Sequence, residues 1–130
     1  MRNIATSIID GNLVQDPEMK KTKTDRTVTT FYVAVNHEWG SKEGNSHVSY
    51  IPVETWEKLA ENCGQYLKKG RKVTVEGELR QDRWVDENGR MHSRVKIVAR
   101  AVRFDPSARA RGGETETDGD PVLEKDTAAA

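Results

Sequence analysis

The chain has 130 residues, enough for one domain with a modest core, and its single cysteine, Cys63, excludes an intramolecular disulfide. With no apolar run near the roughly 20 residues that span a bilayer, and no recognisable signal peptide, we expect a cytoplasmic protein. Residues 1–111 carry 20 Lys and Arg against 15 Asp and Glu, a balance of +5, whereas residues 112–130 carry one against six, a balance of −5. The net charge of zero therefore hides a basic body and an acidic tail, which predicts an electrostatic partner for the body.

The first half of the chain has the patterns of three β-strands. Apolar residues alternate unevenly over residues 3–14, where Gly11 interrupts the pattern as a glycine does at a bulge or sharp bend. A turn and a charged loop follow at residues 16–26. Residues 28–36 and 47–54 alternate as strands, so we expect their odd-numbered apolar residues to face inward.

One helix is predicted over residues 56–69, because apolar residues recur there at helical spacing. Its apolar stripe comprises Leu59, Cys63, Tyr66 and Leu67. Thr55 is the expected N-cap, and Cys63 is expected to be a buried thiol rather than a nucleophile.

Two more strands, residues 72–84 and 91–104, flank a strong hairpin signal at residues 86–89. In the first of them the alternation predicts four inward residues: Val73, Val75, Gly77 and Leu79. The alternation slips near Ala99, which predicts a bulge. Residues 106–130 are acidic and lack periodic apolar residues, so this tail is expected to be disordered.

Five strands with a helix between the third and fourth predict an all-β, five-stranded OB-fold barrel over residues 1–105, followed by the tail. Such barrels bind oligonucleotides or oligosaccharides on the face of strands 2 and 3 and on the loops that join strands 1–2 and 4–5.

Four aromatic residues lie in polar sequence close to Lys or Arg: Trp39, Tyr50, Trp56 and Trp84. Exposed rings beside cations suit unstacked nucleic-acid bases, because each base stacks on a ring while the cations follow the phosphates. The alternative is that these rings cap the core, since Trp is usually largely buried. Tyr32, on the outward side of the second strand, is a further candidate.

The candidate phosphate ligands are Lys58, Lys69, Arg71, Lys72, Arg80 and Arg83, and the further cations Arg2, Arg94 and Lys96 are also considered for this role. The run of basic residues from 68 to 72 is the densest in the chain, and it could equally be a solvated helix end.

The chain resembles the bacterial single-stranded DNA-binding protein family over about residues 1–105. The matching segments are Gly11-Asn12-Leu13 with Asp16-Pro17-Glu18, residues 33–36 leading to Trp39, residues 56–61, residues 66–70, residues 73–79, Trp84-Val85-Asp86 with Gly89, and residues 98–104.

That resemblance implies that Trp39, Tyr50, Trp56 and Trp84 stack on DNA bases, with Tyr at position 50 where the family more often has Trp. It also implies a nucleoid-associated homotetramer that protects unwound DNA in replication, recombination and repair. Family members usually end in an acidic tip with a Pro-plus-aromatic peptide that recruits replication and repair enzymes. This chain has Pro121 but no terminal aromatic, so we expect recruitment to be reduced or absent.

Catalytic chemistry finds little support in the sequence. His37, His47 and His92 show no metal-ligand spacing with one another or with Cys63, and no phosphate-binding glycine loop is present. We therefore expect no catalytic residue, no metal and no cofactor. A second hypothesis is a primosome-type or RNA-binding OB-fold adaptor, although such adaptors tend to lack several of the stacking aromatics.

Overall fold

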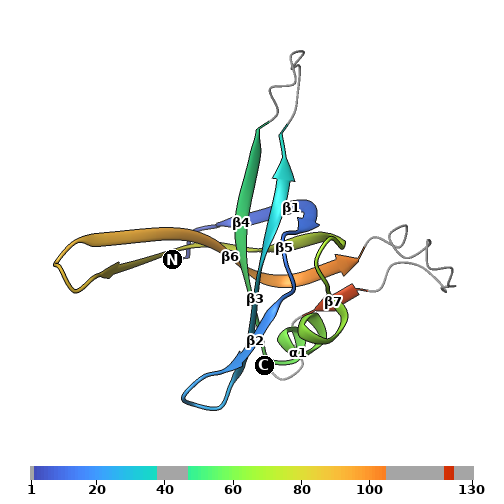
Figure 1. Cartoon of the computed structure of the whole chain (residues 1–130), viewed down its shortest axis with the longest axis horizontal. Coiled ribbons are helices and arrows are strands. Elements are labelled where there is room, and N and C mark those ends of the chain that lie inside the picture. The colour runs from blue at the N-terminus through green and yellow to red at the C-terminus, as the bar shows by residue number, and fades with distance from the viewer. Residues whose placement is uncertain (1, 38–46, 105–121, 125–130) are drawn as a thin grey trace, which may run out of the picture.

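The computed structural model describes residues 2–37, 47–104 and 122–124. The elements in chain order are β1 (Thr6–Leu13), β2 (Glu18–Lys21), β3 (Thr27–Asn36), β4 (Val48–Trp56), α1 (Glu57–Tyr66), β5 (Lys72–Val85), β6 (Met91–Phe104) and β7 (Val122–Glu124). Figure 1 shows the strands wrapped about one another, with α1 at one end and the β5/β6 hairpin extending as a long arm. Of the helices described, none has the length and apolar character to cross a membrane.

The strands form one closed sheet in the order β1-β5-β6-β4-β3-β2. Pairing of β1 with β3, where Leu13 lies opposite Val33, closes the barrel. All neighbours are antiparallel except β4 and β6, which pair in parallel over a short stretch. The five predicted strands correspond to β1, β3, β4, β5 and β6, with the helix between the third and fourth of them, so the predicted OB-fold barrel is confirmed.

The barrel interior is filled by the inward side chains that alternation predicts. Phe31 and Val33 of β3 are buried, as are Val73 and Val75 of β5. Cys63 of α1 packs in the same cluster, and its burial raises the pKa of its thiol to about 12. The prediction of a buried thiol is therefore confirmed, and the raised pKa disfavours the thiolate that a nucleophile requires.

Two glycines lie where the backbones of neighbouring strands approach closely. A side-chain carbon at Gly11 would collide with the carbonyl oxygen of Ala34 beside the closure of the barrel, and one at Gly77 would collide with the carbonyl oxygen of Val98. At Gly77 the register between β5 and β6 shifts by one residue, so that Arg100 has no partner across the ladder. The bulge predicted near residue 99 is confirmed at this point.

Two short strands fall outside the predicted elements. β2 lies in the segment predicted to be a turn and a charged loop, and it pairs with β3. All four of its side chains are exposed, so no alternation marks it in the sequence. β7 lies within the tail predicted to be disordered, and it pairs with residues 101–103 of β6. The other tail residues are outside the described part of the chain.

The helix is shorter than predicted, and Thr55 is not its cap. α1 begins after Trp56, which occupies the N-cap position without a side-chain hydrogen bond. The Thr55 hydroxyl is buried and donates to the Thr29 carbonyl at 2.9 Å, while the Thr29 hydroxyl donates to the Ala60 carbonyl at 2.7 Å. Thr55 therefore ties β4 to β3 instead of starting the helix.

Two residues predicted to lie in the core are instead largely exposed. Leu79 follows the inward alternation of β5, but it lies one residue beyond Glu78, where the ladder between β5 and β1 ends. Tyr66 is the last residue of α1, and its neighbour Leu67 is the one that packs in the core. Both predictions failed because periodicity gives the side of an element and not the point where the core ends.

Candidate nucleic-acid interface

The register of β3 and β4 places three aromatic side chains on one outward face. Tyr32 lies opposite Pro52, Tyr50 opposite Ala34, and Trp56 opposite Val28. Because neighbouring side chains along a strand point to opposite faces, these rings lie on the side away from the core residue Phe31. Tyr50 is 60% exposed, and Trp56 is partly buried.

The β5/β6 arm continues this outward face. Trp84 lies opposite His92, Asp82 opposite Arg94, and Arg80 opposite Lys96. An Arg94 guanidinium N–H donates to the Tyr32 hydroxyl at 3.5 Å, which joins the arm to β3. We call this continuous surface, which carries Tyr32, Tyr50, Trp56 and Trp84, the ring face.

Trp84 is supported from one side and remains 47% exposed. Its ring stacks on that of His92, with centroids 5.5 Å apart and an interplanar angle of 19°. His92 Nε2 lies 2.7 Å from a carboxylate oxygen of Asp86, and this hydrogen bond is the main cause that lowers the pKa of Asp86. The ring is thus held in place while a large part of it stays accessible to a ligand.

Trp56 is fixed by polar contacts at the end of β4. Its indole Nε1–H donates to Glu54 Oε1 at 3.1 Å, and the Arg26 guanidinium carbon lies 4.6 Å from the centre of the ring. Arg26 Nε donates to Glu57 at 2.6 Å. Glu57 has a φ of +56°, in the left-handed region that is costly for a residue with a side chain. Arg26 was not among the candidates, because no local pattern links it to a ring 30 residues away.

Lys96 is the one charged side chain among the buried residues that the structure describes, with 8% exposure. Its ammonium lies 3.0 Å from Glu54 Oε2 and 2.9 Å from Asp82 Oδ2. Burial alone would lower the pKa of this ammonium, but the hydrogen bonds to Asp82 and Glu54 outweigh burial and raise it. The bond to Lys96 likewise lowers the pKa of Asp82. Both shifts favour the charged forms of Lys96 and Asp82 at neutral pH.

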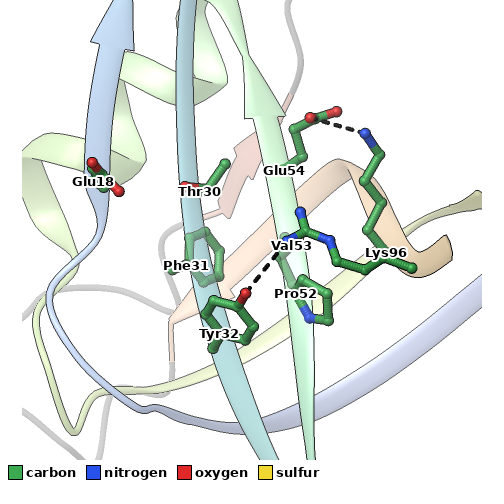
Figure 2. Close-up of a pocket in the computed structure, with 9 residues that line it drawn as sticks. Glu18, Thr30, Phe31, Tyr32, Pro52, Val53, Glu54 and Lys96 are labelled. Carbon is green, nitrogen blue, oxygen red and sulfur yellow. Dashed lines mark hydrogen bonds and ion pairs between the residues drawn. The ribbon is translucent and has the colours of Figure 1, made fainter. Parts of the chain in front are cut away.

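A cavity of about 190 Å³ opens on the ring face beside these groups. Figure 2 shows Lys96 and Glu54 turned toward one another on one side of it, with Tyr32 and Pro52 side by side on neighbouring strands. Glu18 of β2 lies on the opposite side. The ring face is therefore hollowed rather than flat, and its cations are balanced by carboxylates.

The candidate basic residues are divided between several places. Lys58 is exposed in the first turn of α1, close in sequence to Trp56. Arg80 lies on the ring face, where its Nε donates to Glu78 at 3.1 Å. Arg83, opposite Ser93, lies on the other face of the arm.

The basic run at residues 68–72 lies at the opposite end of β5 from Trp84. Lys72 begins β5 and Trp84 lies 12 residues further on, about 40 Å along an extended strand. The Arg71 guanidinium lies 4.5 Å from the centre of the Phe104 ring. The Lys69 backbone N–H donates to Asp16 at 2.9 Å. Lys72 thus lies at the barrel end of β5, with Lys69 and Arg71 just before it in the chain, whereas Trp84 lies near the other end of that strand.

Trp39, the fourth aromatic residue expected to stack on DNA bases, lies outside the described residues, so its position relative to the ring face is not described. In the part of the chain that the structure describes, no three His, Cys, Asp or Glu side chains are grouped so that they could hold a metal ion.

Comparison with known proteins gives one consistent result. Residues 4–105 match the model of the single-strand binding protein family. The chain is 38% identical over 119 residues to a single-stranded DNA-binding protein of Caldanaerobacter subterraneus subsp. tengcongensis, covering 92% of this chain and 79% of the relative. It is 35% identical over 130 residues to single-stranded DNA-binding protein 2 of Chlorobaculum tepidum, covering 98% and 86%. Single-stranded DNA-binding protein 1 of Streptococcus pyogenes serotype M6 is 33% identical over 121 residues, covering 90% and 92%.

Proposed function

Because the chain belongs to the single-strand binding protein family, we propose that it binds single-stranded DNA on the ring face without reading its sequence. In this role it keeps unwound DNA extended and protected during replication, recombination and repair. The observation that carries the proposal is that Tyr32, Tyr50, Trp56 and Trp84 share one outward surface, although they come from three strands.

The physical basis of binding is stacking combined with screening of the phosphates. Every base has a π-face, so exposed rings hold successive bases whatever the sequence, at about 1–3 kcal/mol for each stacked base. Arg94 and Arg80 are cations on the same face. The hairpin arm extends this surface beyond the barrel, which lengthens the path that a strand can follow.

The protein acts by binding and not by catalysis in this proposal. The carboxylates on the ring face are engaged: Glu54 and Asp82 bind Lys96. The relatives at 33–38% identity are named single-stranded DNA-binding proteins, which favours this function over an RNA-binding or primosome-type adaptor.

Assembly as a homotetramer is part of the same proposal. The family resemblance supports it, and the N-terminal region carries apolar surface that a monomer leaves in water. Ile4 is 91% exposed, and Ile8 of β1 is 68% exposed. Exposed apolar side chains grouped in one segment of the chain are typical of an interface between copies.

Titration of the intrinsic tryptophan fluorescence tests the proposed function. We expect oligo-dT to quench the emission strongly, because a base stacked on Trp56 or Trp84 changes the surroundings of the indole. Affinity should fall with salt, with a logarithmic slope of about −0.7 for each phosphate neutralised. Duplex DNA of equal length is the control. Weak quenching by oligo-dT, or tighter binding of the duplex, would contradict the proposal.

A further inference from the structure

We infer that Lys96 is a positioning residue for DNA binding: with Glu54 and Asp82 it fixes the Trp56 indole and holds the arm that carries Trp84 against β4. The inference rests on the proposed function of the ring face. It assigns to these three residues, the positioning triad, the task of setting the relative placement of two stacking rings.

The triad connects three strands through an unbroken chain of contacts. The Trp56 indole donates to one oxygen of Glu54, and Lys96 donates to the other at 3.0 Å. Lys96 also lies 2.9 Å from Asp82, on the neighbouring strand of the arm. Trp84 follows Asp82 by two residues on the same face, so the chain runs from one ring to the strand segment that bears the other.

The triad lies where the backbone pairing between the arm and the barrel ends. The ladder between β4 and β6 contains only two residue pairs, Val53 with Ile97 and Glu54 with Val98. Lys96 is the first residue of β6 outside that ladder on the side of the arm. Beyond the ladder, the side-chain contacts of Lys96 therefore join the base of the arm to β4. A small change in the angle between the arm and the barrel at this point produces a larger displacement of Trp84.

A direct phosphate contact fits Lys96 poorly. The side chain is buried, and its ammonium already binds two carboxylates. The triad carries a net charge of −1, which by itself repels a polyanion. Two carboxylates on a surface that binds DNA weaken its electrostatic attraction for the phosphates. The role that fits Glu54 and Asp82 is therefore to position the stacking rings.

Removing the acids of the triad separates positioning from electrostatics. If charge alone mattered, E54Q and D82N would each bind oligo-dT more tightly than the unmodified protein. Positioning predicts the opposite, a loss of about threefold to tenfold, which is a fraction of the cost of deleting a stacked ring. The matched control is E18Q, which removes an exposed acid lining the same cavity and paired with exposed Lys20. E18Q should bind as tightly as the unmodified protein or slightly more tightly.

The salt dependence of K96M tests the same inference from the cation side. A lysine that neutralises one phosphate lowers the salt slope by about 0.7 when it is removed, whereas a positioning residue lowers the affinity and leaves the slope unchanged. Tighter binding by E54Q and D82N, or a slope reduced by one phosphate in K96M, would overturn the inference.

The Trp56 indole N–H resonance of the DNA-free protein gives a readout independent of DNA. E54Q and K96M should shift it, because the Glu54 carboxylate accepts its hydrogen bond, and E18Q should leave it in place. Thermal unfolding shows whether each variant is folded. An unshifted indole resonance in folded K96M would overturn the inference whatever the DNA result. If oligo-dT fails to bind even the unmodified protein, the proposed function fails, and the indole resonance still tests the triad.

Discussion

Replacement of Phe31 by alanine is expected to lower the free energy of unfolding by about 3–5 kcal/mol, the usual cost of removing a fully buried ring and leaving a cavity. Phe31 is 2% exposed and belongs to the core cluster that includes Val33, Val53 and Leu59. Surrounding strands in a closed barrel can collapse only partly into the space. Urea or guanidinium unfolding, followed by circular dichroism, measures the loss.

The adjacent residue provides the control for Phe31. Tyr32 lies on the ring face, so Tyr32→Ala should leave stability nearly unchanged and weaken DNA binding instead. A loss below about 1 kcal/mol for Phe31→Ala would contradict the assignment of this side of β3 to the core.

Trp84→Ala should weaken binding of oligo-dT by about 1–3 kcal/mol and leave folding largely intact. The ring is exposed on the arm, where it contacts His92 across the hairpin rather than the barrel interior. Trp84→Phe keeps a π-face, so its affinity for oligo-dT should lie between that of the unmodified protein and that of Trp84→Ala. Fluorescence anisotropy of a labelled oligo-dT measures the affinity, and thermal unfolding measures the stability.

Val85→Ala is the matched control for Trp84. Val85 is the next residue of the arm, exposed on the opposite face, so its truncation should leave DNA affinity unchanged. If Trp84→Ala unfolds the protein without a separate binding defect, the ring caps the core, and the interpretation of this residue as a stacking platform is wrong.

The order of the main strands along the chain and the inward residues of the barrel were predictable, because alternation and turn residues are local signals. Phe31 and Val75 follow a period of two, and the slip at residue 99 marks the observed bulge at Arg100. β2 gave no signal, because its side chains are all exposed. The cap assigned to Thr55 was wrong for another reason: a threonine before a helix can also be a buried strand residue, and only tertiary packing decides.

The geometry of the ring face was less predictable than its composition. The aromatic residues could be named from their polar sequence surroundings, but their common face depends on strand register. Arg26 contacts Trp56, which is 30 positions away in the chain. Lys96 binds Asp82, 14 positions away, and Glu54, 42 positions away. No periodic pattern encodes such contacts, so Lys96 was interpreted in the sequence as a possible phosphate ligand.

Photo-crosslinking identifies the side chains that touch single-stranded DNA and so shows whether the DNA lies on the ring face. An oligo-dT containing 5-iodouracil, irradiated in complex with the protein, joins covalently to aromatic side chains in contact with the base, and mass spectrometry identifies them. We expect links at Tyr50, Trp56 and Trp84. Tyr66 is the internal control, because it is 49% exposed but lies at the end of α1. Links at Tyr66 with none at the three ring-face residues would show that the DNA binds elsewhere on the protein.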